Sequence, residues 1–148
     1  MGSNSKAVLT LQGFDELLKQ IEKAGGSIDS AAVKATEKSA DVVAAELKAQ
    51  AQAADVPGSV IDEITREPVT MENNIIRGAV GWKLGNYDPR NLSKGYKAVF
   101  LNYGAVRKNR GTIKARGFIL AAKKASKKKV KAMQQEAFEE ILKGLKQQ

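Results

Sequence analysis

The segment from Ala31 to about Ala54 constrains the fold more than any other part of the chain. It is rich in Ala, Glu, Lys and Gln and contains neither Gly nor Pro, which is typical of a long helix. Small and apolar residues recur along one stripe of that helix, namely Ala32, Thr36, Ala40, Val43, Leu47 and Ala51. Ala40 and Ala44 would allow a neighbouring element to approach closely. Pro57-Gly58 is a turn signal that ends the helix.

Two further helices are predicted, one on each side of this segment. Apolar residues recur at helical spacing from Phe14 to Ile21, and Ala24-Gly25-Gly26 ends that helix. Three residues then have side chains suited to cap the next helix, namely Ser27, Asp29 and Ser30. A last helix is expected from about Phe118 to Leu145. Its predicted inner stripe is Val130, Met133, Ala137, Ile141 and Leu145, flanked by Phe138 and Leu142.

The β-prone segments are short. Residues 8–11 suit an edge strand, and so do residues 64–69, because Pro68 cannot donate a hydrogen bond to a neighbouring strand. Residues 72–74 suit a hairpin turn. The alternation that follows predicts a half-buried strand with one face formed by Ile76, Gly78, Val80, Trp82 and Leu84. Trp82, the only tryptophan, is therefore expected in the core rather than as a binding anchor.

The remaining segments complete the predicted fold. Residues 85–95 are expected to be a loop, and residues 96–103 suit a strand or, as we favour, a short helix ended by Gly104. Residues 106–114 are basic and contain Gly, which indicates an exposed loop or a mobile hairpin.

We predict an α+β fold in a single domain over residues 1–148. It combines a small antiparallel sheet of three to four strands, the long Ala-rich helix packed on it, and a C-terminal helix over residues 118–145. Residues 1–6 are expected to be flexible and residues 105–115 to form an exposed basic loop.

The side chains that most often carry enzyme chemistry are missing. The chain has no His and no Cys, which excludes disulfides, thiolate nucleophiles, Cys-based zinc sites and the commonest general base. Adjacent carboxylates occur, but no nucleophile–base pair accompanies them. The glycines of residues 78–85 match no phosphate-binding motif. The longest apolar runs are far below the roughly 20 residues of a spanning helix. We therefore expect no catalysis, cofactor, metal, small-molecule substrate or membrane insertion.

The net charge of +9 is concentrated in one region. Between Arg90 and Lys131 there are 14 Lys or Arg residues and no Asp or Glu, whereas the rest of the chain is net acidic. The cations singled out as a candidate interface or DNA-facing set are Arg107, Lys108, Arg110, Lys114, Arg116, Lys123, Lys124, Lys127, Lys128 and Lys129. Three interpretations stay open: a solvated helix face, a nucleic-acid site, and an interface with an acidic protein. The aromatic residues among these cations, which are core candidates or base-stacking candidates, are Tyr96, Phe100, Tyr103 and Phe118.

Four short motifs, in order, resemble a family of small tailed-bacteriophage proteins. The opening Gly13-Phe14-Asp15-Glu16-Leu17-Leu18 precedes the Ala-rich helix, and residues 54–60 loosely resemble the turn before the family's hairpin. Residues 98–104, Ala-Val-Phe-Leu-Asn-Tyr-Gly, resemble the family's Tyr-x-x-Phe-Val-Glu-Phe-Gly-Thr. Residues 116–119, Arg-Gly-Phe-Ile, resemble its Arg-Pro-Phe-Leu. The family comprises head–tail joining proteins, labelled neck or minor tail components, and is similar to the tail-completion protein of phage lambda.

The family-motif positions are Asn102, Tyr103, Gly104, Arg116 and Phe118. The chain departs from the pattern where Asn102 replaces the usual Glu, Ala105 a Thr and Gly117 a Pro. The resemblance implies a non-enzymatic virion protein of the tail or neck, made in the cytoplasm of the host bacterium. It also implies a ring of copies, expected to be a hexamer, with neighbouring connector and tail proteins as partners and DNA as a candidate contact.

Overall fold

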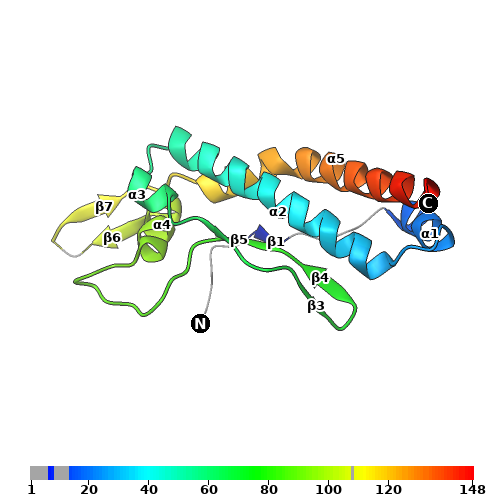
Figure 1. The fold of residues 1–148 in the computed structure, drawn as a ribbon. Helices are drawn as coiled ribbons and strands as arrows, with labels where there is room; N and C mark the ends of the chain where they lie inside the picture. The colour runs from blue at the N-terminus through cyan, green and yellow to red at the C-terminus, as the bar shows by residue number, and fades with distance from the viewer. Residues whose placement is uncertain (1–6, 9–13, 108) are drawn as a thin grey trace.

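The computed structural model describes residues 7–8, 14–107 and 109–148 (Figure 1). Residues 1–6, expected to be flexible, lie outside the described residues. The helices are α1 (Asp15–Lys23), α2 (Ile28–Ala53), α3 (Gly58–Ile61), α4 (Lys94–Tyr103) and α5 (Phe118–Lys146). The strands are β1 (Ala7–Val8), β2 (Thr65–Arg66), β3 (Thr70–Glu72), β4 (Ile75–Arg77), β5 (Ala79–Gly81), β6 (Ala105–Arg107) and β7 (Gly111–Ile113). All strand pairs are antiparallel, so the predicted α+β class is confirmed.

Helices α2 and α5 run antiparallel along the length of the molecule, and α1 packs where α5 ends (Figure 1). All six residues of the predicted α2 stripe are buried, which confirms that prediction. The helix begins earlier than Ala31, because the Ser27 hydroxyl accepts the backbone N–H of Ser30 at 3.2 Å and so caps it. Pro57 does not simply end α2, as predicted, but precedes the short helix α3, which the sequence analysis missed.

The inner face of α5 differs from the predicted stripe. Of the five stripe residues only Ala137 is buried, together with the flanking Phe138 and Leu142. The buried face also includes Ser126 and Gln134, which apolar periodicity cannot identify. Ser126 is accommodated because its hydroxyl donates to the Lys123 carbonyl at 3.3 Å. Val130, Ile141 and Leu145 of the predicted stripe pack half-buried against the two apolar clusters, so the predicted face is confirmed in part.

The strands form one three-stranded sheet, ordered β1-β5-β2, and two hairpins, β3–β4 and β6–β7. The single strand predicted over residues 75–84 is divided at Gly78 and ends at Gly81, so that β4 belongs to a hairpin and β5 to the sheet. The predicted hairpin turn is confirmed, with Asn73 and Asn74 both at positive φ, as a two-residue turn requires. Strand β2 is an edge strand, as predicted, although it is shorter than residues 64–69. The predicted strand at residues 8–11 is described only at Val8, which pairs within β1 with β5.

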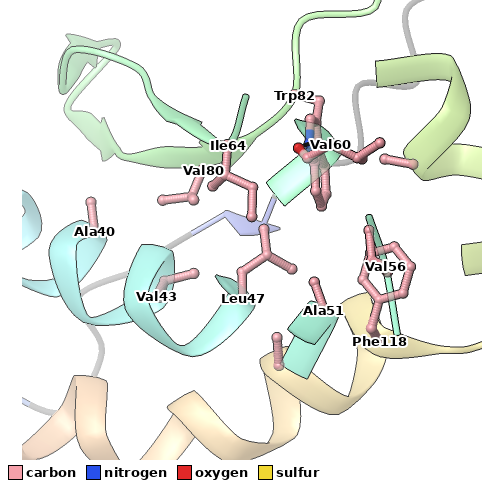
Figure 2. Close-up of a cluster of buried hydrophobic side chains, with 12 residues drawn as sticks. Ala40, Val43, Leu47, Ala51, Val56, Val60, Ile64, Val80, Trp82 and Phe118 are labelled. Atoms are coloured by element: carbon pink, nitrogen blue, oxygen red, sulfur yellow. Dashed lines mark hydrogen bonds between the residues drawn. The ribbon is translucent and has the colours of Figure 1, made fainter. Parts of the chain in front are cut away.

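Two apolar clusters lie along the helix pair. In the larger one, Val43 and Leu47 of α2 point toward the strand residue Val80 (Figure 2). Trp82 is 1% exposed in this cluster, and its indole Nε1 donates to the Val60 carbonyl at 2.7 Å. The predicted core role of Trp82 is thus confirmed. The second cluster joins α1 to the far ends of α2 and α5 and contains Phe14, Ile21, Ala31, Ala35, Ala137, Phe138 and Leu142.

Candidate interaction surface

The motif residues lie close together where the chain leaves α4, forms the β6–β7 hairpin and enters α5. The backbone N–H of Arg116 donates to the Leu101 carbonyl at 3.0 Å, and that of Gly117 donates to the Asn102 carbonyl at 3.1 Å. The Asn102 side chain is 4% exposed, and its Oδ1 accepts the N–H of Ile119 at 2.9 Å. Since Gly117 has no capping side chain, Asn102 supplies from α4 the acceptor that the first turn of α5 needs.

Gly104 allows the hairpin to return over the end of α4. Its φ of 79° lies in the region that favours glycine, and its ψ is 167°. A Cβ atom there would lie 2.8 Å from the Ile113 carbonyl oxygen and 3.0 Å from the Ala115 nitrogen. Both the backbone conformation and the close approach therefore require glycine.

The side chains of Arg116 and Phe118 both make contacts within the molecule. The Arg116 guanidinium donates to the carbonyls of Ala54 and Asp55, at 3.1 and 2.8 Å, just beyond the end of α2. The Phe118 ring is buried and meets Trp82 edge-on, with ring centroids 5.9 Å apart. Arg116 thus joins three segments of the fold, and the Phe118 ring is too buried to stack a base. Tyr103, in contrast, is exposed.

The basic segment after α4 forms the β6–β7 hairpin, at the end of the molecule opposite α1 (Figure 1). Within it the Arg107 guanidinium donates to the Arg110 carbonyl at 3.1 Å. Lys114 follows the hairpin and is exposed, whereas Lys108 lies outside the described residues. An open groove of about 750 Å³ separates the hairpin from the ends of α2 and α4, and Arg107, Lys114 and Arg116 are among its lining residues.

The lysines of α5 fall into two groups. Lys129 pairs with Glu46 of α2 at 2.8 Å, and this hydrogen bond, with a second from Gln50, lowers the pKa of Glu46. On the other side of α5 are exposed lysines with no ion pair to any residue that the structure describes, namely Lys123, Lys124, Lys127, Lys128 and Lys131. The basic region between Arg90 and Lys131 is therefore not uniform. It contains cations that are paired within the molecule and a separate face of unpaired lysines on α5, called the free lysine face below.

Two further candidate aromatic side chains, Tyr96 and Phe100, contact each other, and Tyr96 also contacts Tyr87. Tyr96 meets Tyr87 with ring centroids 5.1 Å apart and Phe100 with centroids 6.5 Å apart. The three residues lie in α4 and the loop before it. They form a local aromatic group rather than a row alongside the lysines of α5.

Large apolar side chains are exposed on both hairpins. Val106 of β6 is 87% exposed, and Met71 and Ile75 of the β3–β4 hairpin are 51% and 47% exposed. These residues were not among the contacts predicted from the sequence. The available signal was their place in a short hairpin, where polar residues are usual near the turn: Ile75 directly follows the two-residue turn, and Met71 lies one position before Glu72.

Neither a metal-binding cluster nor a membrane-spanning helix is found among the described residues. No three of their carboxylates gather closely enough to hold a metal ion, and the chain has no His or Cys to add. None of the helices in the described ranges combines the length and apolarity of a membrane span.

A comparison with family models finds a match over most of the helices. The model described as "Bacteriophage HK97-gp10, putative tail-component" matches residues 15–104, which span α1 through α4. No curated protein and no solved structure matches the chain. Since the matched region covers more than half of the sequence, the chain belongs to the HK97-gp10-like family of bacteriophage tail components.

Proposed function

We propose that this chain acts at the head–tail junction of a bacteriophage virion, as a neck or tail-completion protein. In this function copies of the chain join in a ring, expected to be a hexamer, and contact neighbouring connector and tail proteins without catalysing a reaction. Membership in a phage tail-component family supports a structural role in the virion. The protein would be made in the cytoplasm of the host and then incorporated into the tail or neck.

The observation that carries this proposal is the pair of projecting hairpins with exposed apolar side chains. A ring requires two different surfaces on each copy, so that one copy's first surface meets the next copy's second. Hairpins β3–β4 and β6–β7 are separate two-stranded units, and each has edges to which no further described strand is paired. Exposed apolar side chains such as Val106 gain free energy when a partner covers them.

Light scattering and electron microscopy of the purified protein, with and without connector and tail-tube proteins, test the proposal. We expect rings, alone or on the partners, and we expect Met71→Asp or Val106→Asp to prevent them. Leu120→Asp is the matched control. Leu120 is also an exposed apolar residue, but it lies in the first turn of α5, where an acidic side chain is favourable. A protein that stays monomeric and binds no connector or tail component would refute the proposal.

A further inference from the structure

We infer that the free lysine face of α5 binds the phosphate backbone of duplex DNA without reading its sequence. The face is defined by Lys123, Lys124, Lys127, Lys128 and Lys131. Lys123, Lys127 and Lys131 are spaced four residues apart and form one row, and Lys124 and Lys128 form the row beside it. At 1.5 Å of rise per residue, the first row spans about 12 Å of helix. Duplex DNA presents a negative charge about every 1.7 Å along its axis, so several phosphates face such a row.

An ordinary solvated face does not account for this arrangement. Solvated helix faces commonly mix charges of both signs, and like charges three or four residues apart destabilise a helix. Helix α5 does pair opposite charges where it borders α2, as Lys129 with Glu46 and Glu140 with Lys38 show. On the free face no acidic residue occurs between Arg90 and Lys131. No acidic side chain on this face offsets the repulsion among its lysines, and a bound anion would reduce that repulsion.

The side-chain types on the face favour DNA over an acidic protein. Protein interfaces are depleted in Lys and enriched in aromatic residues and Arg, whereas this face has five lysines and no aromatic residue. Lys is a point charge on a flexible stem and needs no fixed partner geometry. Leu120, at the start of the face, is its one large apolar residue with marked exposure.

The same composition favours a duplex over a single strand. Single-strand sites stack bases on aromatic side chains beside the cations. The aromatic residues of α5, Phe118 and Phe138, are buried, and the exposed Tyr87 and Tyr103 belong to the loop before α4 and to α4 itself. The lysine face thus offers charge without stacking partners, as backbone binding that ignores sequence requires. This inference does not depend on ring formation.

Fluorescence anisotropy with a labelled duplex of arbitrary sequence, from about 25 to 200 mM salt, tests the inference. The test variant is Lys123→Gln/Lys127→Gln/Lys131→Gln, which removes one whole row. The matched control is Lys19→Gln/Lys143→Gln/Lys146→Gln, which removes the same charge from exposed lysines of α1 and the end of α5. Circular dichroism verifies that both variants are folded.

We expect the row variant to bind at least about tenfold more weakly at 50 mM salt, since three phosphate contacts are lost. The slope of its plot of log affinity against log salt should become less negative by about 2 to 3, because each lost phosphate contact contributes roughly 0.9 to the slope. The control should keep the wild-type slope. The inference is overturned if both variants weaken equally, if the wild type binds no duplex at low salt, or if a single strand binds more tightly. It is also overturned if the row variant loses acidic connector or tail proteins while its DNA binding is unchanged.

Discussion

Asn102 and Gly104 show how single residues hold the junction between α4 and α5. Asn102 stands where the resemblance described above implies a Glu, and its side-chain oxygen caps α5 from outside that helix. What the position provides here is a buried acceptor, and a carboxylate oxygen is an acceptor too. Gly104 then allows the hairpin to pass close to the end of α4. The two motif residues are thus explained by backbone geometry, before any partner is considered.

Replacing Asn102 with Ala should lower the free energy of unfolding by about 1–2 kcal/mol, because the N–H of Ile119 loses its acceptor. Asn102→Asp keeps an oxygen at the same place, beside the positive end of the helix dipole, and should lose less at neutral pH. Urea denaturation of both variants measures the difference. Equal losses for Ala and Asp would contradict a capping role.

Replacing Gly104 with Ala should lower the free energy of unfolding by about 2–4 kcal/mol, because an unfavourable backbone conformation adds to a clash with the Ile113 carbonyl. Gly111→Ala separates the two causes. Gly111 has a similar φ of 78°, but a Cβ there would meet nothing within 4 Å. We expect it to lose only about 1–2 kcal/mol in the same thermal or urea measurement. If the two variants lose the same amount, the close approach contributes nothing.

At the scale of elements, α5 combines a mixed-sign border with α2 and a single-sign outer face. Lys127 has lysines at three helical neighbour positions, namely Lys123, Lys124 and Lys131. Each such pair is unfavourable by about 0.2–0.5 kcal/mol. The free protein therefore carries a local destabilisation on this face.

Lys127→Gln should for that reason raise the free energy of unfolding by about 0.5–1.5 kcal/mol at low salt, with the gain fading as salt is added. Lys143→Gln is the control, since Lys143 follows Glu139 and Glu140 at helical neighbour positions and loses attraction instead. Thermal melts at two salt concentrations give both results. A gain at Lys127 that persists in high salt would point to a cause other than charge.

Helix α5 also shows how far the sequence could predict the fold and the surface. The stripe of α2 was predicted fully because its residues are small or apolar, so that burial and composition agree. The buried face of α5 was predicted only in part, because Ser126 and Gln134 are polar residues whose burial depends on tertiary contacts. Likewise the charge count located the basic region but not the partners of its cations. Arg116 binds the carbonyls of residues 54 and 55, and Lys129 binds Glu46, and both partners are distant in the sequence.

At the scale of the whole molecule, α2 and α5 connect two apolar clusters. The cluster around Trp82 includes the sheet and the start of α5, and the cluster around Phe138 includes α1 and the end of α5. The hairpin β6–β7 lies at the first end, opposite α1 (Figure 1). Two cross-helix ion pairs, Lys38–Glu140 and Lys129–Glu46, bridge α2 and α5 between these ends. The molecule thus consists of two antiparallel helices joined by ion pairs, from which the two hairpins extend.

The two ion pairs contribute to the way stability depends on pH. Hydrogen bonds from Lys129 and Gln50 lower the pKa of Glu46, and a hydrogen bond and charge from Lys38 lower that of Glu140. A carboxyl whose pKa is lower in the folded state stabilises that state above its unfolded pKa, and this stabilisation is lost as the pH falls through the folded pKa. Since the chain has no His, no side chain of ordinary pKa titrates between about pH 5 and 8.

We therefore expect the urea midpoint to be nearly constant from about pH 5 to 8 and to fall below about pH 4.5, the range in which carboxyls of ordinary pKa take up protons. Lys38→Gln/Lys129→Gln should reduce that acid dependence, because Glu46 and Glu140 then have pKa values closer to those in the unfolded chain. Side-chain carboxyl NMR of the same variant should show both pKa values rising. A stability transition between pH 5 and 8, or an unchanged acid slope in the variant, would contradict this assignment.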